Sequence, residues 1–281
     1  MDTQSLIQNI VAEIKTVVGV KAIVLGGSRA RGTHHAGSDI DLGIYYANHL
    51  GLDLPELAKV ATKIDDEHRT QVITPIGGWG PWINGGGWLR VQSMPVDFLY
   101  KDLDQINHVI NDCLTGKVEM VYQPGHPFGF ISSIYLAETA ICQPLWDTEG
   151  CIANLKAKIT PYPLALQKAI IQKFAWEVNF SLEIAKKGMA KADVAYVAGC
   201  CFRAVMCILQ VLFALNKVHW LNEKGAVAIA DAFLIKPAQF KSRVNDIFAL
   251  LSATPETIGQ AIILLKALND DVSDLLQHNQ G

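Results

Sequence analysis

The chain has 281 residues, of which 50% are hydrophobic and 18% are charged, and its formal net charge is -3. This composition is too apolar for a disordered chain and predicts a packed globular protein, while the length favours two domains. The small negative charge provides no basic surface of the kind that neutralises phosphates, so we expect no nucleic-acid partner.

The cysteines and the apolar segments indicate a cytoplasmic protein. The six cysteines form no CxxC pair and no zinc-type spacing with histidine, which predicts reduced thiols. The sequence does not begin with a basic segment followed by an apolar stretch, so we expect no secretory signal. The segment 195–215 is apolar enough to suggest a membrane span, but Arg203 and Gln210 lie within it, and we expect a buried helix and no membrane partner.

The first elements predicted along the chain are a helix over residues 5–18, a short buried strand over 21–26 and an alternating strand over 40–46. The alternation in the last of these places apolar residues on one face and Asp39 and Asp41 on the other. We therefore expect two acids on one face of a sheet.

A helix is expected next, over residues 54–66, and then a strand over 70–74. Two further strands, over 89–92 and 96–100, are predicted to form a hairpin around Ser-Met-Pro. In the second of these strands, Asp97 lies on the face opposite to the apolar residues. A third acid is therefore predicted on a strand.

The loop 75–88 separates these strands and is rich in glycine and tryptophan. Loops of this length in compact domains are usually functional or disordered, and the tryptophans argue against disorder. Trp79, Trp82 and Trp88 either stack on a base or a cyclic acceptor or pin the loop to the sheet, and the sequence does not decide between these roles.

From about residue 102 the strand pattern stops and helical patterns follow. A passage marked by proline and glycine suggests a first domain over residues 1–125 and an α-helical second domain over 126–281. The candidate helices of this second region lie at 131–142, 164–187, 193–216, 237–251 and 256–277. The expected fold class is therefore α+β, with a mixed sheet and its helices followed by a helical bundle.

A glycine pair and a serine form a candidate phosphate-binding turn. Gly26 and Gly27 end the predicted buried strand and would let backbone amides approach a phosphate closely. Ser28 adds a hydroxyl donor where a helix is expected to begin, and partial positive charge at that end favours anions.

The two aspartates follow this turn at a fixed distance. Ten residues between Ser28 and Asp39 return the chain to the sheet, so that Asp39 and Asp41 emerge beside the turn. Together with Asp97 they provide hard oxygen ligands for one or two magnesium ions. Asp97 is also the acid best placed to act as a general base.

These residues resemble the pattern of the DNA polymerase beta-like nucleotidyltransferase superfamily, which has Gly-Ser, about ten residues, Asp-x-Asp and a third carboxylate on a later strand. The resemblance covers residues 21–46 and extends to about residue 100. It is closest to small-molecule adenylyltransferases of the aminoglycoside and lincosamide type, in which a helical C-terminal domain closes over the nucleotide. It implies magnesium-dependent transfer of AMP from ATP to a hydroxyl of a small molecule, with release of pyrophosphate.

The resemblance carries two further implications. In those relatives a lysine at the start of a helix in the second domain reaches the triphosphate, and Lys224 is the matching residue here. A homodimer is expected by the same analogy. The loop 75–88 is not a general feature of the characterised resistance enzymes, so the acceptor is left open.

Two other functions stay open at this point. One is modification of a protein side chain, as in minimal nucleotidyltransferase antitoxins, although those proteins are little more than the catalytic domain. The other is a non-catalytic sensor that binds ATP without turnover, although all three acids are present.

Overall fold

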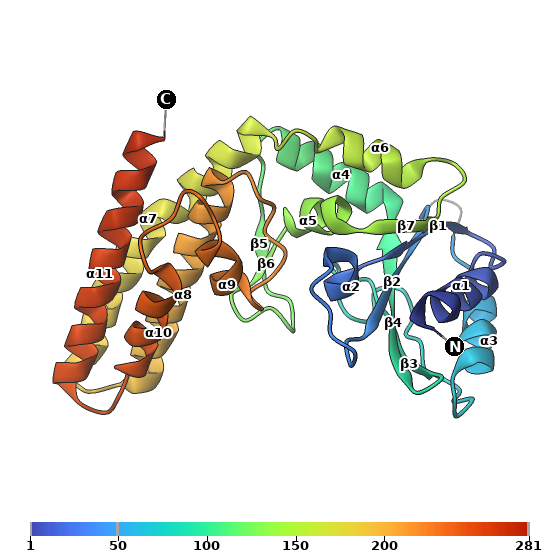
Figure 1. The fold of residues 1–281 in the computed structure, drawn as a ribbon, viewed down its shortest axis with the longest axis horizontal. Coiled ribbons are helices and arrows are strands. Elements are labelled where there is room, and N and C mark those ends of the chain that lie inside the picture. Colours follow the sequence, from blue (N-terminus) through green and yellow to red (C-terminus); the bar gives the residue numbers. More distant parts are fainter. Residues whose placement is uncertain (1, 49–50, 280–281) are drawn as a thin grey trace. The chain divides into compact units, whose positions relative to one another are not determined.

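The computed structural model describes residues 2–48 and 51–279. The chain divides into two compact units (Figure 1). The first comprises Met1–Asn111 and Tyr135–Thr160, and the second comprises Asp112–Ile134 and Pro161–Gly281.

The first unit is built on a five-stranded mixed sheet with the order β3-β4-β2-β1-β7. Its strands are β1 (Val20–Leu25), β2 (Ile40–Tyr46), β3 (Gly86–Val91), β4 (Met94–Asp102) and β7 (Gln143–Trp146). Strands β2 and β4 are parallel, whereas the other neighbouring pairs are antiparallel. The expected mixed sheet is confirmed.

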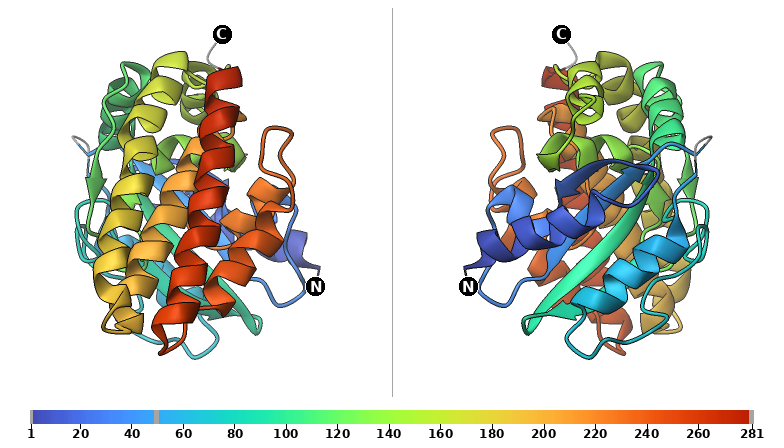
Figure 2. Two further views of the ribbon diagram at one scale, coloured as in Figure 1. Left: turned by 90° about the vertical axis from the view of Figure 1, so that its left-hand side faces the viewer. Right: turned by 90° about the vertical axis from the view of Figure 1, so that its right-hand side faces the viewer.

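Several helices pack against this sheet. They are α1 (Thr3–Ile14), α2 (Gly27–Arg31), α3 (Leu54–Ile64), α4 (Leu103–Leu114), α5 (Ile134–Ile141) and α6 (Cys151–Lys158). Helices α1 and α3 cover one face of the sheet (Figure 2, right), where their apolar stripes bury the apolar side chains of β2 and β4. The acids of these strands consequently lie on the opposite face.

The second unit is mainly a helical bundle. Its helices are α7 (Leu164–Met189), α8 (Val194–Leu215), α9 (Ala226–Asp231), α10 (Phe240–Ala249) and α11 (Pro255–His278), and a small hairpin adds β5 (Met120–Val121) and β6 (Phe130–Ile131). Helices α7, α8 and α11 lie side by side (Figure 2, left). Among the described residues, α8 is the one helix long and apolar enough to cross a membrane, but 78% of its most apolar window is buried, as expected for a core helix.

Two sequence predictions differ from the structure. The strand expected over 70–74 is wrong, since only Ile73 makes an isolated bridge, to Gly87, and the positive φ of Gln71 interrupts an extended run. The strand pattern also does not stop at residue 102, because β7 joins the main sheet by pairing with β1. Residues 135–160 thereby belong to the first unit, whereas the predicted division placed them in the second.

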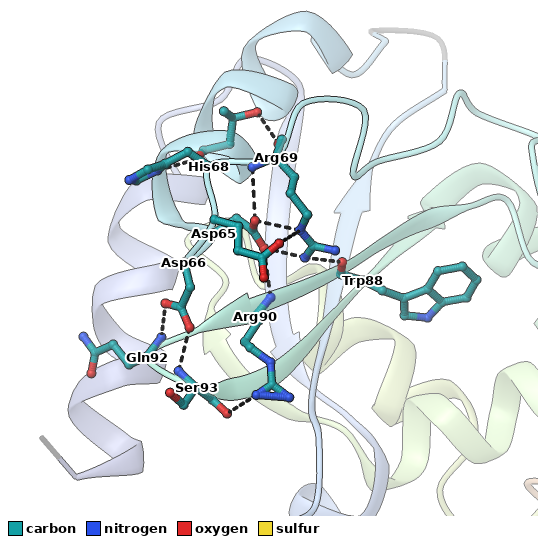
Figure 3. Close-up of polar contacts among 10 residues, drawn as sticks. Asp65, Asp66, His68, Arg69, Trp88, Arg90, Gln92 and Ser93 are labelled. Atoms are coloured by element: carbon teal, nitrogen blue, oxygen red, sulfur yellow. Dashed lines mark hydrogen bonds and ion pairs between the residues drawn. The ribbon is translucent and has the colours of Figure 1, made fainter.

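The hairpin of β3 and β4 is held at its tip by Asp66, which follows α3 (Figure 3). The two carboxylate oxygens of Asp66 accept hydrogen bonds from the backbone amides of Gln92 and Ser93, each at 2.7 Å. Gln92 and Ser93 both have positive φ, as a tight two-residue hairpin turn requires. The turn is therefore one position earlier than the Ser-Met-Pro segment predicted for it.

Asp65, the residue before Asp66, has a fully buried carboxylate. It accepts hydrogen bonds from the guanidinium of Arg69 at 2.9 and 2.6 Å and from the amide of Arg90 at 3.0 Å. These bonds, led by those from Arg69, hold the pKa of Asp65 well below its usual value although burial opposes them. Arg69 also donates to the carbonyl of Trp88 at 3.3 Å, so the ion pair ties α3 to β3.

We predict that Asp65→Asn lowers the free energy of unfolding at pH 7 by about 2 kcal/mol, because it removes the charge of a buried carboxylate that pairs with the half-exposed Arg69 and weakens the hydrogen bonds to it. Folding lowers the pKa of Asp65, so its ionised carboxylate stabilises the folded state fully at any pH above the pKa that Asp65 has in the unfolded chain. This stabilisation is lost as the pH falls, so the difference in stability between Asp65→Asn and wild type shrinks below about pH 4. Urea unfolding at several pH values measures it. Glu67→Gln, at a side chain 75% exposed, should change stability by less than about 0.5 kcal/mol.

Candidate active site

The turn after β1 packs directly against the carboxylate of Asp41. The amide of Gly26 donates to the carbonyl of Asp41 at 2.8 Å, which closes the turn onto β2. Gly27 has a φ of +59°, and a Cβ there would lie 1.8 Å from Oδ2 of Asp41. Only glycine leaves room for this carboxylate. Helix α2 begins at Gly27, so Ser28 lies in its first turn, as predicted.

The return loop to β2 is held by Arg29, to which the sequence assigned no site role. Its guanidinium donates to the carbonyl of Ser38 at 2.7 Å and to that of Asp39 at 3.0 Å. Asp39 is exposed and lies one residue before β2, rather than inside the strand. A side chain from α2 thus positions the first acid of the Asp-Ile-Asp motif.

Asp41 and Asp97 are direct neighbours on the two parallel strands β2 and β4. Residues paired in this register project from the same face of a sheet, so the two partly buried carboxylates lie side by side. Burial first, and then the charges of Asp41 and Asp39, raise the pKa of Asp97 to about 6. The arrangement thus favours a proton or a cation at this point.

The paired carboxylates can be compared with the ligands that magnesium takes in proteins. Within residues 2–48 and 51–279, no group of three or more His, Cys, Asp or Glu side chains is arranged to hold a metal ion by itself. Magnesium in proteins, however, is commonly bound by one or two carboxylates together with substrate phosphates and water. Asp41 and Asp97 match that donor set, and Gly27 lies directly against the carboxylate of Asp41.

The three tryptophans of the loop differ in their surroundings. Trp82 packs against Tyr135 of α5 with ring centroids 5.9 Å apart, and its carbonyl accepts a hydrogen bond from the Tyr135 hydroxyl at 2.7 Å. Trp79 and Trp88 instead stack on each other, and Trp88 is the register partner of Asp97. Trp82 pins the loop, while the stacked pair lies beside the acids.

The first unit therefore brings together five predicted site residues: Gly26, Gly27, Ser28, Asp41 and Asp97. Asp39 is close enough for its charge to affect Asp97. Lys224 belongs to the second unit, where it is exposed in the turn before α9, and its predicted contact with a triphosphate stays a prediction.

Comparison with known proteins bears on this site. Residues 7–76, which contain the glycine turn and the first two acids, match the family model described as "Nucleotidyltransferase domain". This segment of the chain is similar to a nucleotidyltransferase domain. The match supports a transferase enzyme that moves a nucleotidyl group, and it does not distinguish among the subfamilies.

Two other comparisons add little to the nucleotidyltransferase assignment. The solved structure of a nucleotidyltransferase-like protein from Exiguobacterium sibiricum 255-15 is similar to this chain with a TM-score of 0.46 and 9% identity, over 98% of this chain and 78% of that one. No curated protein sequence matches. The family match is what supports the transferase activity.

The paired carboxylates lead to a prediction about titration. Of the two neighbouring charges, that of Asp41 raises the pKa of Asp97 more, and Asp41→Asn removes it. The pKa of Asp97 should therefore fall from about 6 while staying above about 3.9, because Asp97 remains partly buried. Asp39→Asn should lower this pKa less. Carbon-13 NMR of the carboxyl groups follows both shifts, with Glu67→Gln as a control that leaves Asp97 unchanged. A pKa that does not move in Asp41→Asn would show that the two acids are not coupled.

Proposed function

We propose that this protein is a magnesium-dependent nucleotidyltransferase that transfers AMP from ATP to a hydroxyl of a small molecule and releases pyrophosphate. The observation that carries the proposal is the pairing of Asp41 with Asp97 beside the Gly26–Gly27 turn. The amides of Gly27 and Ser28 would bind phosphate oxygens, and the acids would lie where charge develops during transfer.

Asp97 is the group that would take the proton of the attacking hydroxyl. Without bound magnesium, a pKa of about 6 makes this carboxylate basic enough to accept a proton. The acceptor oxygen forms a bond to the α-phosphorus while the bond to the bridging oxygen breaks. Pyrophosphate leaves with that oxygen, and the hydroxyl proton passes to Asp97.

Bound magnesium would neutralise charge on the transferring phosphoryl group and on the leaving pyrophosphate. Asp41 and Asp97 are the residues that would hold it, with Asp39 as a further carboxylate nearby. Gly26, Gly27 and Ser28 would orient the phosphates. Lys224, by resemblance to small-molecule adenylyltransferases, would add a positive charge to the triphosphate.

A small-molecule acceptor fits the absence of a net basic charge better than a nucleic acid does.

One experiment distinguishes a small-molecule acceptor from the alternative in which a protein side chain is modified. The purified protein is incubated with ATP labelled in the adenosine part, magnesium and a cell lysate, and proteins are then separated from metabolites. We expect magnesium-dependent label in the metabolite fraction, absent with Asp41→Asn. Label confined to protein bands would rule out the small-molecule acceptor, and nucleotide binding without any turnover would favour a sensor.

The glycine turn provides a matched pair of variants. Gly27→Ala forces the carboxylate of Asp41 away from its place, so pyrophosphate release should fall at least about hundredfold, the loss expected for a misplacement of about 1 Å. Gly32→Ala also introduces a side chain at positive φ, +74°, at the end of α2, but a Cβ there meets no atom within 4 Å. Its activity should stay within about threefold of wild type. Equal losses in the two variants would mean that backbone strain, and not the Asp41 contact, is responsible.

A further inference from the structure

Trp88 belongs to a row of side chains that crosses one face of the sheet. Trp88 on β3 pairs with Asp97 on β4, and Asp97 pairs with Asp41 on β2. Paired residues share a face, so the row runs from the indole to the two acids. Gly27, the first residue of α2 after β1, closes the row on the far side of Asp41. The indole and the glycine turn thus flank the acids from opposite sides.

The indole of Trp88 is part of a fixed aromatic stack. Its ring and that of Trp79 have centroids 4.6 Å apart and planes inclined by 23°. Trp79 in turn lies over the backbone of β3, where a Cβ on Gly86 would come within 3.1 Å of its ring. Trp88 nevertheless remains 62% exposed, and its indole points away from the Asp65–Arg69 ion pair (Figure 3). One face of Trp88 is therefore used by Trp79, and much of the remaining ring surface is open.

The loop that supplies Trp79 is held in place at several points, so the stack is preorganised. Its backbone is tied by hydrogen bonds from the hydroxyl of Tyr100 to Thr74 (3.0 Å), from the amide of Gly86 to the Thr74 hydroxyl (3.0 Å), and from Gln105 to Pro81 (2.7 Å). Because the exposed ring is held on an ordered segment, a ligand that stacks on it would not have to order it first.

We propose that the Trp79–Trp88 stack is the binding platform for the acceptor, and that the acceptor is a small molecule with a flat ring next to its reacting hydroxyl. This rests on the proposed nucleotidyl transfer. In that reaction the attacking and leaving oxygens are roughly in line with the phosphorus. If pyrophosphate leaves on the side of the Gly27 turn, the attacking hydroxyl arrives from the side of Asp97, and a ring attached to it lies over Trp88.

The platform also makes chemical sense for such a ligand. Stacking on an aromatic side chain holds a ring by its face and tolerates variation in its substituents. The hydroxyl beside the ring would then be placed at the carboxylate of Asp97, the proposed base. An open-chain polyol has no such face and would gain nothing from the stack.

Two neutral probes rich in hydroxyls test the platform: phenyl β-glucoside, which carries a flat phenyl ring, and sorbitol, which is an open chain without a ring. Their binding to the whole protein with magnesium is measured by calorimetry or ligand-observed NMR, which needs no turnover. We expect the ring probe to bind more tightly than sorbitol, and Trp88→Ala to weaken its binding at least about tenfold, within the range of aromatic stacking. Trp88→Phe should stay within about threefold of wild type. Trp176→Ala removes a comparably exposed indole, 60% exposed, from α7 and should leave binding unchanged.

Steady-state kinetics with the best ring acceptor then separates the acceptor from the donor. Trp88→Ala should raise the KM for the acceptor at least about tenfold and leave the KM for ATP unchanged. A change in the KM for ATP alone would make the stack a site for the nucleobase and overturn the proposal. So would a wild type that does not bind the ring probe, or equal binding by wild type and Trp88→Ala. Ring binding that depends on Trp88, without turnover for any acceptor, would contradict nucleotidyl transfer while supporting the platform.

Discussion

The carboxylate of Asp66 accepts hydrogen bonds from the amides of Gln92 and Ser93 and so holds a two-residue turn in which both φ angles are positive. Positive φ costs free energy in residues other than glycine, and these bonds offset that cost. Register in a hairpin follows from its turn, and a slip by one residue would move every side chain to the other face. The placement of Trp88 next to Asp97 therefore depends on an aspartate at the end of α3.

The parallel pairing of β2 with β4 imposes a second constraint, which works against stability. It sets Asp41 beside a partly buried Asp97, and the raised pKa of Asp97 means that the folded state disfavours its ionised form. The resulting loss of stability is absent below about pH 4 and complete above about pH 6. Such destabilising pairs of carboxylates occur mostly at functional sites, because a site that disfavours two negative charges favours a bound cation or a transferred proton.

The sequence predicted best where its pattern alone determines the structure. The alternation in β2 predicted its bounds, Ile40–Tyr46, and the apolar periodicity predicted α7, α8 and α11. Prediction from the sequence failed where a contact between residues far apart in the chain determines the local structure. The strand β7 contains Pro144, which disfavours a strand, yet β7 is at the edge of the sheet, where proline is tolerated. The turn at Gln92 lacks the usual Asn-Gly or Asp-Gly and is stabilised by a carboxylate from another element, so local turn chemistry could not reveal it.

The same limit applies to the arrangement of the candidate site residues. Gly27 and Asp41 are close in the sequence, and their spacing predicts that they meet. The position of Trp88 beside Asp97 depends on the register of the hairpin, whose turn was predicted around Ser-Met-Pro and lies at Gln92 and Ser93. With the register known, the order of the strands arranges a glycine turn, two acids and an aromatic ring across one sheet. Under the proposed function, the first unit contains both the reactive groups and one surface for the acceptor, so part of the substrate specificity would be encoded in its sheet.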